Sequence, residues 1–504
     1  MRAYMYKISV VMAVYNTEEY LEEAIESVIR QSIGFKEIQL ILVDDGSMDG
    51  SGAVCDRYRE KYPDNIEVIH QKNSGRAAAS NAGLRLIRGR YVNFLDSDDI
   101  FSEETFSQVY EFFENYREKI DLVSVPMVYF GGKTGEHPLN YKFKKGTRVV
   151  SLWEEEDVVQ LHLGSAFVRA CVAEKMHFDE TQVVGIDARE CMRLLLPKMA
   201  LGLVEEGKYY YRIREGGNLS ILQAGKFKKE RYAYHLERFS LYILELYRQK
   251  YGRVPPAVQY MVMYELQSRI RQKNIPDGVL SIEETVCYKK RICEVLAQID
   301  DAIILSQRNL NYSQKITALS LKYNKKVYLE YLPDDVVIYV GENKIRSMAT
   351  LVMQLEIVNI NGKTLYLEGY MNFVGINEDD DIELYLDFQG KRYTLQKKET
   401  RIIETWLAQF NILQYFSVEI ALENKEYGEE GRIVFYSGIQ NSCFRRKLLR
   451  LPGNTKHIKL NKQYEIENIG GGVLGIVYIS RRGIKNYVKG VSARMKRGRG
   501  KGSK

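Results

Sequence analysis

The chain's first expected strand reads KISVVMAV over residues 7–14, and this stretch decides the fold of the N-terminal part. Nearly every residue in it is apolar, which is typical of a parallel strand buried on both faces of a sheet. Apolar residues at helical spacing follow between Leu21 and Val28, and a second apolar run covers residues 39–43. The alternation of helix and strand continues with expected elements over residues 51–62, 66–70, 76–86 and 91–95. It predicts an α/β domain with an open, mainly parallel sheet and helices on both faces.

Polar clusters directly follow three of these strands. They are Tyr15-Asn16, Asp44-Asp45 and Asp96-Ser97-Asp98-Asp99. In open α/β sheets, ligands bind at the carboxyl ends of the strands, because loops and helix N-termini converge there. We therefore expect the three clusters to meet at one edge of the sheet and to form a binding site.

The cluster Asp96-Ser97-Asp98-Asp99 places three carboxylates within four residues. Their mutual repulsion requires a compensating charge, and Mg²⁺ or Mn²⁺ suits the position because hard cations prefer oxygen ligands and bridge carboxylates to phosphates. The alternative is a solvated turn in which an aspartate caps a helix. Taken alone, the cluster does not decide between the two interpretations.

Four motifs occur in a fixed order along the chain. They are VVMAVYN (10–16), VDDGSMDGS (43–51), NSGRAAASNAG (73–83) and GRYVNFLDSDD (89–99). In this order and spacing the set closely resembles family 2 glycosyltransferases, which have the Rossmann-like GT-A fold. The resemblance covers roughly residues 7–220 and does not extend to the C-terminal half.

The resemblance implies a site for the nucleotide and the donor sugar. Ala13 and Tyr15 are expected beside the base, and Asp45 is expected to accept a hydrogen bond from the N–H of its ring. Uracil carries such a donor between two carbonyls, so a UDP-linked sugar is favoured. Asp96 and Ser97 are expected near the ribose or the donor sugar.

The same resemblance implies a metal site and cationic contacts to the diphosphate. Asp98 is expected to be the principal ligand of Mg²⁺ or Mn²⁺, with Asp96 as a second ligand. Arg76 is placed to offset phosphate charge. Arg212 or Arg214 is a further candidate for the diphosphate, although a basic edge strand explains these two arginines equally well.

An inverting transfer also needs a base for the acceptor hydroxyl. Relatives carry this carboxylate about ninety residues past the metal motif, usually as Glu-Asp before a helix. Here Phe178-Asp179-Glu180 and Gly185-x-Asp187 fit that pattern, but Ile186 replaces the usual Glu. Asp187 is therefore the expected catalytic base, a helix N-cap is the alternative interpretation, and Glu190 is the second candidate.

The composition divides the chain into four segments. The GT-A domain is expected over 1–225, a helical segment over 226–325, an all-β sandwich-like domain over 326–480 and a basic tail over 481–504. The tail holds ten Lys or Arg residues and no acidic residue, so it is expected to be disordered and to be attracted to anionic membrane surfaces.

Other classes of protein find little support in the sequence. The net charge of +7 is concentrated in the basic tail, which argues against a general nucleic-acid binder. The six cysteines form no CxxC motif. Neither a signal peptide nor an 18-residue apolar run is found, so the expected location is cytoplasmic, with a peripheral association at the plasma membrane.

The expected function is an inverting, metal-dependent transfer of a sugar from a nucleotide diphosphate to an acceptor. The acceptor is expected to be a saccharide, a lipid-linked chain or a polymer. By resemblance, the setting is the assembly of bacterial cell-surface polysaccharide, capsule or teichoic acid. The alternative is a non-catalytic protein that binds sugar nucleotides or serves as a scaffold, and its one support is the missing Glu at Ile186.

Overall fold

A computed structural model describes most of the chain, namely residues 4–182, 184–214, 227–325, 327–374, 382–404, 406–407, 409–422, 431–439, 442–460 and 464–478. The chain forms two compact units. One comprises residues 1–269 with 275–309, and the other comprises residues 270–274 with 310–504. The predicted basic tail, 481–504, lies outside the described residues.

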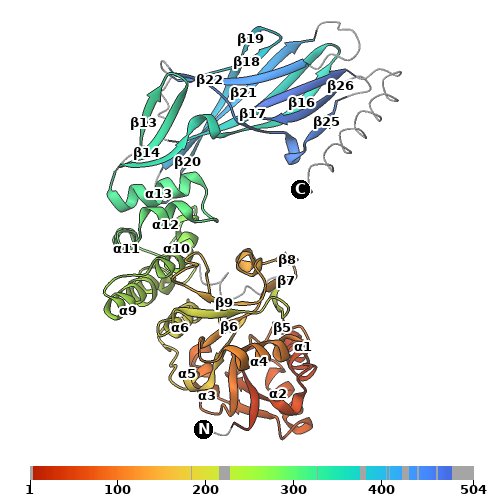
Figure 1. The fold of residues 1–504 in the computed structure, drawn as a ribbon, viewed down its shortest axis with the longest axis vertical. Helices are drawn as coiled ribbons and strands as arrows, with labels where there is room; N and C mark the ends of the chain where they lie inside the picture. Colours follow the sequence, from red (N-terminus) through yellow and green to blue (C-terminus); the bar gives the residue numbers. More distant parts are fainter. Residues whose placement is uncertain are drawn as a thin grey trace. The chain divides into compact units, whose positions relative to one another are not determined.

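An eight-stranded sheet forms the centre of the N-terminal unit, in the order β3-β2-β1-β4-β10-β6-β11-β9 (Figure 1). Its strands are β1 (Tyr6–Val14), β2 (Ile38–Asp44), β3 (Ile66–His70), β4 (Gly89–Phe94), β6 (Leu122–Ser124), β9 (Arg148–Ser151), β10 (Ala166–Arg169) and β11 (Ala200–Leu203). The first four strands are parallel, with Val10 of β1 paired to Leu40 on one side and to Asn93 on the other. The predicted parallel sheet is thus confirmed, and the ends of β1, β2 and β4 lie at one edge.

Helices flank this sheet, as the alternating pattern predicted (Figure 1). They are α1 (Glu18–Ile29), α2 (Ser51–Lys61), α3 (Arg76–Leu84), α4 (Thr105–Tyr116), α5 (Ala170–Ala173) and α6 (Ile186–Leu195). In α1 the residues at helical spacing, Leu21, Ile25 and Val28 among them, are fully buried. Their burial fixes the helix against the sheet, since each such side chain contributes about 1.5–3 kcal/mol of hydrophobic free energy.

A second, four-stranded sheet lies beside the acidic cluster. Its order is β5 (Ile100–Phe101), β12 (Tyr209–Ile213), β7 (Met127–Gly131) and β8 (Gly135–Glu136). Tyr209 and Tyr210 pair with Phe101 and Ile100, which directly follow the aspartates. This register brings a strand from more than a hundred residues away to the edge where the site forms.

Most of the helical segment packs within the N-terminal unit. Its helices are α8 (Ala233–His235), a π-helical turn (Leu236–Leu241), α9 (Tyr242–Tyr251), α10 (Pro256–Ile270), α11 (Ile282–Leu296) and α12 (Asp301–Ser306). The hydroxyl of Tyr247 donates to the carbonyl of Met192 at 2.6 Å, and that of Tyr251 donates to Leu196 at 2.5 Å. Because these bonds join α9 to α6 and the residue after it, the helices up to Asn309 belong to the same unit as the sheet. This division differs from the separate segment 226–325 expected from the sequence.

The C-terminal unit is rich in strands, as the period-two pattern predicted. After α13 (Tyr312–Tyr323) come a three-stranded sheet (β13-β14-β15), a five-stranded sheet (β20-β21-β17-β16-β24) and a seven-stranded sheet (β19-β18-β22-β27-β26-β25, with β23 beside β22). The strands are β13 (Val327–Leu332), β14 (Asp335–Val340), β15 (Asn343–Ser347), β16 (Val352–Asn361), β17 (Thr364–Val374), β18 (Ile382–Phe388), β19 (Lys391–Thr394), β20 (Gln396–Glu404), β21 (Gln409–Ala421), β22 (Gly431–Ile439), β23 (Ser442–Arg445), β24 (Leu448–Arg450), β25 (His457–Lys459), β26 (Tyr464–Gly470) and β27 (Val473–Tyr478). Along β17, Leu365, Leu367, Met371 and Phe373 are fully buried and alternate with more exposed residues.

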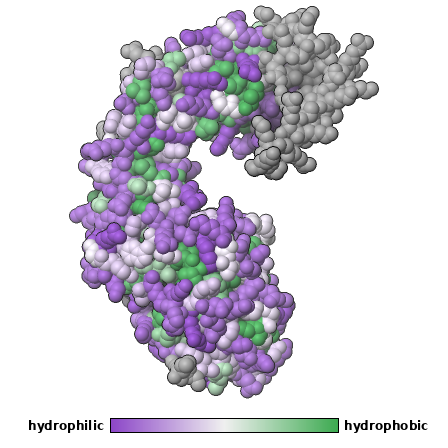
Figure 2. All heavy atoms as spheres, viewed as in Figure 1, coloured by the Kyte–Doolittle hydropathy of each residue, from purple (hydrophilic) through white to green (hydrophobic). Residues whose placement is uncertain are grey.

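The surface is mostly polar on the face shown in Figure 2, with apolar residues in smaller groups. Among the residues that the structure describes, no helix has the length and apolar character required to span a bilayer.

Candidate active site

The acidic cluster follows β4 at the carboxyl edge of the sheet. Asp99 is its most buried member and points inward: the hydroxyl of Tyr209 donates to its Oδ2 at 2.5 Å, and the backbone N–H of Arg212 donates to its Oδ1 at 2.7 Å. Burial raises the pKa of Asp99 well above its ordinary value, the charges of Asp98 and Asp96 add to this shift, and the two hydrogen bonds oppose it. Asp99 therefore anchors the cluster to β12, which leaves Asp96 and Asp98 as the more accessible carboxylates.

Two arginines of and after β12 hold Asp98. Both Nε and Nη2 of Arg214 lie 2.7 Å from its Oδ2, and Nε of Arg212 donates to its backbone carbonyl at 2.7 Å. The guanidinium of Arg212 also lies over the rings of Tyr20 and Phe130, at 5.0 and 4.2 Å from their centroids. Both arginines thus lie at the acidic cluster, and the choice between a diphosphate contact and a basic edge strand stays a prediction.

Arg76 joins the acidic cluster to the expected base. Its Nη2 lies 2.6 Å from Oδ1 of Asp96 and 3.2 Å from Oδ2 of Asp187. Arg76 is the first residue of α3, whereas Asp187 lies in the first turn of α6. Three residues that the sequence analysis singled out separately thus meet at one point, although 111 positions separate Arg76 from Asp187.

The local fold places Asp187 in the first turn of α6. The N-cap of α6 is Gly185, with φ 75°, so the alternative interpretation of Asp187 as the N-cap is wrong. Asp187 therefore lies near the positive end of the helix dipole. The second candidate, Glu190, is only 1% exposed, and both of its oxygens accept from Nη1 of Arg193 at 2.9 Å. Glu190 is therefore occupied by its own partner on α6.

The expected nucleotide residues lie at the ends of β1 and β2. Tyr15 is 44% exposed, as a platform for a planar base would be, whereas Asp45 is buried. The carboxylate of Asp45 accepts from the backbone N–H groups of Ser74 and Gly75 at 2.9 and 2.8 Å, and from Nε2 of Gln71 at 2.7 Å. Asp45 thus fixes the loop that leads into α3, a positioning role that the sequence did not reveal.

The two remaining donor-side residues differ in accessibility. Ala13 is partly exposed beside Tyr15, and Ser97 is buried, where its hydroxyl accepts from Oγ1 of Thr17 at 3.1 Å. The bond from Thr17 ties the acidic cluster to the start of α1.

The donor chemistry of the cluster fits a hard divalent cation that arrives with its substrate. Among the described residues no group of three or more His, Cys, Asp or Glu side chains forms a ready-made metal site. Mg²⁺ is commonly held by one or two carboxylates together with substrate phosphates and water, so Asp98 and Asp96 suffice as protein ligands. Burial raises the pKa of Asp96 to about 6, and the charges of Asp187 and Asp98 add to the rise while Arg76 opposes it.

His162 is a neighbour of the site that sequence reasoning did not select. Its ring makes edge contacts with Tyr209 and Tyr211, at centroid distances of 5.2 and 5.8 Å. Burial lowers the pKa of His162 to about 4, so its imidazole is neutral near pH 7. No sequence signal pointed to it, because the contact depends on β12 passing beside residues 162–165.

A mainly parallel α/β sheet carries an aspartate cluster at its strand ends, flanked by arginines and by a carboxylate on a separate helix. This arrangement defines a glycosyltransferase of the GT-A class. The model for "Glycosyl transferase family 2" matches residues 9–170. The chain belongs to glycosyltransferase family 2.

Two relatives and one solved structure cover larger parts of the chain. The minor teichoic acid biosynthesis protein GgaB of Bacillus subtilis (strain 168) is 36% identical over 373 residues, which are 73% of this chain and 41% of GgaB. The minor teichoic acid biosynthesis protein GgaA of the same organism is 33% identical over 425 residues, which are 82% of this chain and 92% of GgaA. The crystal structure of S. aureus TarS matches with a TM-score of 0.57 at 16% identity and covers 94% of this chain and 86% of that one. The chain thus spans less than half of GgaB and nearly all of GgaA, and the likeness to TarS shows a shared fold.

Proposed function

We propose that the chain transfers a sugar from a UDP-linked donor to a saccharide, lipid-linked or polymer acceptor with inversion of the anomeric centre. The observation that carries this proposal is the meeting of Asp96 and Asp187 at Arg76. Asp96 is the carboxylate on the donor side, and Asp187 is a second carboxylate on a separate helix. The guanidinium of Arg76 joins them, so the two carboxylates can serve the donor and the acceptor of a displacement reaction.

In the proposed reaction, the acceptor hydroxyl attacks the anomeric carbon and gives its proton to a carboxylate oxygen of Asp187. The new glycosidic C–O bond forms as the bond to the diphosphate breaks, and UDP leaves with the electron pair. Arg76 and Arg214 hold positive charge beside Asp96 and Asp98, where negative charge grows on the leaving group.

Metal dependence is part of the proposal, with Asp98 as the principal ligand of Mg²⁺ or Mn²⁺ and Asp96 as a second ligand. When bound, such a cation neutralises charge on the departing diphosphate. The oxygen-only donor set and the crowding of carboxylates support this assignment.

The setting proposed for the enzyme is the assembly of a cell-surface polymer of the teichoic acid kind. The names of GgaB and GgaA support this choice. A non-catalytic sugar-nucleotide binder is the second candidate, because Ile186 stands where relatives carry Glu. Release of UDP in the presence of a mixed acceptor extract would separate the enzyme from the binder.

A ligand screen tests the donor class. The full chain is heated with UDP, UDP-sugars and GDP, each with Mn²⁺, with Mg²⁺ or with EDTA, and its melting temperature is followed. We expect UDP and at least one UDP-sugar to raise the melting temperature only with a divalent cation. Equal shifts in EDTA would contradict the metal site, and a preference for GDP would contradict the choice of uracil.

Arg76→Gln is expected to weaken UDP-sugar binding by about 10- to 150-fold, since a charge-assisted contact to phosphate is worth roughly 1.5–3 kcal/mol. Arg76→Lys should retain part of the affinity because it keeps the charge. Titration calorimetry with UDP measures both variants. Arg57→Gln is the control, because Arg57 forms a single exposed ion pair with Glu22. Unchanged affinity in Arg76→Gln would show that Arg76 does not bind the donor.

Peripheral association with the membrane is proposed for the basic tail, which lies outside the described residues. Each basic residue near an anionic surface contributes about 1 kcal/mol of attraction. Deletion of residues 491–504 is expected to reduce co-sedimentation with phosphatidylglycerol vesicles and to leave UDP binding unchanged. Equal co-sedimentation of the full and shortened chains would refute the role of the tail.

A further inference from the structure

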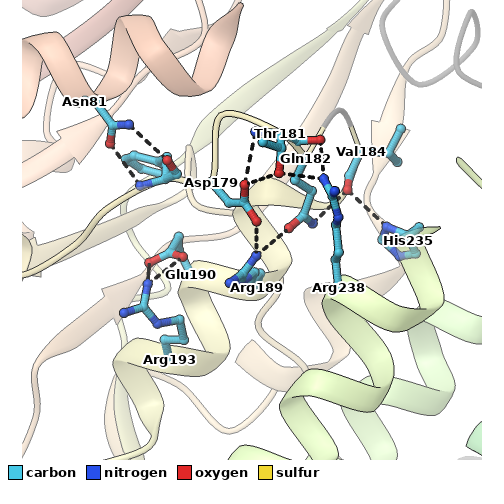
Figure 3. Close-up of polar contacts among 11 residues, drawn as sticks. Asn81, Asp179, Thr181, Gln182, Val184, Arg189, Glu190, Arg193, His235 and Arg238 are labelled. Atoms are coloured by element: carbon cyan, nitrogen blue, oxygen red, sulfur yellow. Dashed lines mark hydrogen bonds and ion pairs between the residues drawn. The ribbon is translucent and has the colours of Figure 1, made fainter. Parts of the chain in front are cut away.

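A buried histidine outside the reaction centre contacts the turn that leads to Asp187. His235 is 1% exposed, and its Nδ1 lies 3.0 Å from the carbonyl oxygen of Val184. Its Nε2 lies 3.2 Å from Oε2 of Glu265 on α10. Glu265 is held in turn by Nη1 of Arg269, 2.6 Å from its Oε1. Figure 3 shows the ring of His235 directed at Val184.

The partners of His235 determine which ring nitrogen carries a proton. A carbonyl oxygen only accepts hydrogen bonds, so Nδ1 must bear a proton toward Val184. On the other side, Nε2 faces Oε2 of Glu265 at 3.2 Å. Burial alone would raise the pKa of Glu265, but its neighbours, Arg269 first, outweigh burial and hold the pKa well below its ordinary value. His235 therefore lies between the carbonyl of Val184 and the carboxylate of Glu265.

The remaining charged and titratable neighbours come from three elements. Arg269 lies on α10 with Glu265, Tyr288 of α11 interacts with Arg269, and Arg231 lies before α8 within electrostatic reach of both Glu265 and Arg269. Glu265 is the carboxylate that faces the ring of His235.

The carbonyl that His235 holds belongs to the residue before the N-cap of α6. Gly185 adopts φ 75°, and a Cβ at this position would collide with Cε1 of His235. The ring of His235 therefore holds the carbonyl of Val184 by a hydrogen bond and fills the space beside Gly185. Asp187 follows two residues later, in the first turn of the helix that this peptide starts.

We propose that His235 is a positioning residue for the transfer reaction: placed between Glu265 and Val184, its ring fixes the Val184–Gly185 turn and thereby the direction of Asp187. The inference rests on the proposed role of Asp187 as the base. It assigns a function to α8, whose His235 contacts the turn that starts α6.

Kinetics of full-length variants test this inference. His235→Phe removes both bonds and is expected to lower kcat at least tenfold, with the KM for the donor and the Kd for UDP changed less than twofold. His235→Gln should recover part of kcat, because its amide can still donate to Val184. Arg238→Gln is the matched control, since Arg238 also binds this segment, but at Thr181 (Figure 3). Thr181 lies further along the sequence from Asp187 than Val184 does. A normal kcat in His235→Phe, or an equal loss in Arg238→Gln, would overturn the proposal.

A spectroscopic measurement covers the case in which the variants do not fold. The chain has six histidines, so selective ¹⁵N labelling gives few signals. His235 is assigned by its loss in His235→Gln, or by elimination of the other five histidines by mutation. We expect Nδ1 of His235 to show the shift of a protonated ring nitrogen, because it donates to the carbonyl of Val184. A ring whose Nδ1 carries no proton would overturn the proposal.

The outcome for Asp187 separates this inference from the proposed function. If Asp187→Asn is fully active, the proposed base is wrong and the inference falls with it. If Asp187→Asn is inactive while His235→Phe turns over normally, only the positioning role of His235 is refuted.

Discussion

Asp187→Asn is expected to lower kcat about 10³-fold, the range by which general-base catalysis accelerates a reaction. An amide keeps the shape of the side chain and an acceptor oxygen toward Arg76, but it takes up no proton from the acceptor hydroxyl. The Kd for UDP should therefore stay within about twofold of the wild-type value. UDP release in a coupled assay measures turnover, and titration calorimetry measures binding.

The control for this variant is Asp157→Asn, which makes the same chemical change at an aspartate paired with Arg308. It should leave turnover unchanged. Normal turnover by Asp187→Asn would move the base elsewhere, to Glu190 first, although Glu190 is enclosed and bound by Arg193. Loss of both turnover and UDP binding would indicate that Asp187 acts on the donor instead.

Asp98→Asn is expected to lower transfer by about 10³-fold and to abolish the effect of divalent cations on UDP binding. Metal neutralisation of a leaving group is worth several kcal/mol, and about 4 kcal/mol corresponds to this factor. The two measurements are turnover at saturating Mn²⁺ and the Kd for UDP with Mn²⁺ and with EDTA. Full activity of the variant would exclude Asp98 as the metal ligand.

Arg214→Gln distinguishes a metal role of Asp98 from a purely structural one. Asp98 is paired with Arg214, so Asp98→Asn could lower turnover by weakening this ion pair and not by losing a metal ligand. If the pair alone mattered, both variants would show the same loss. We expect Arg214→Gln to retain dependence on Mn²⁺, which Asp98→Asn should lack.

The first strands and helices were predictable because their signal is local. Residues 8–12 and Val14 are buried in β1, and the apolar stripe from Leu21 to Val28 is the buried face of α1. The second half of the sheet gave no comparable signal. Strands such as β10, with four residues, are too short for an alternation of apolar and polar residues to be recognised. Their pairing is set by partners far along the chain.

The sequence predicted those site residues that lie in recognisable motifs. It did not predict contacts that only the tertiary structure brings about. Asp96, Arg76 and Asp187 were selected from motifs, and the structure brings them together. The bonds of Asp45 to Ser74 and Gly75, and of His235 to Val184, join segments about 30 and 51 residues apart. Neither residue lies in a pattern that encodes its partner, so only the tertiary structure reveals these contacts.

Arg76 and Arg214 give the aspartate cluster its own counter-ions from within the polypeptide. The fold therefore balances these carboxylates with its own side chains, whereas small metal-dependent domains rely on the ion itself. Under the proposed function, arrival of the donor would be an exchange of ionic partners, in which phosphate oxygens take over the guanidinium groups and release the carboxylates.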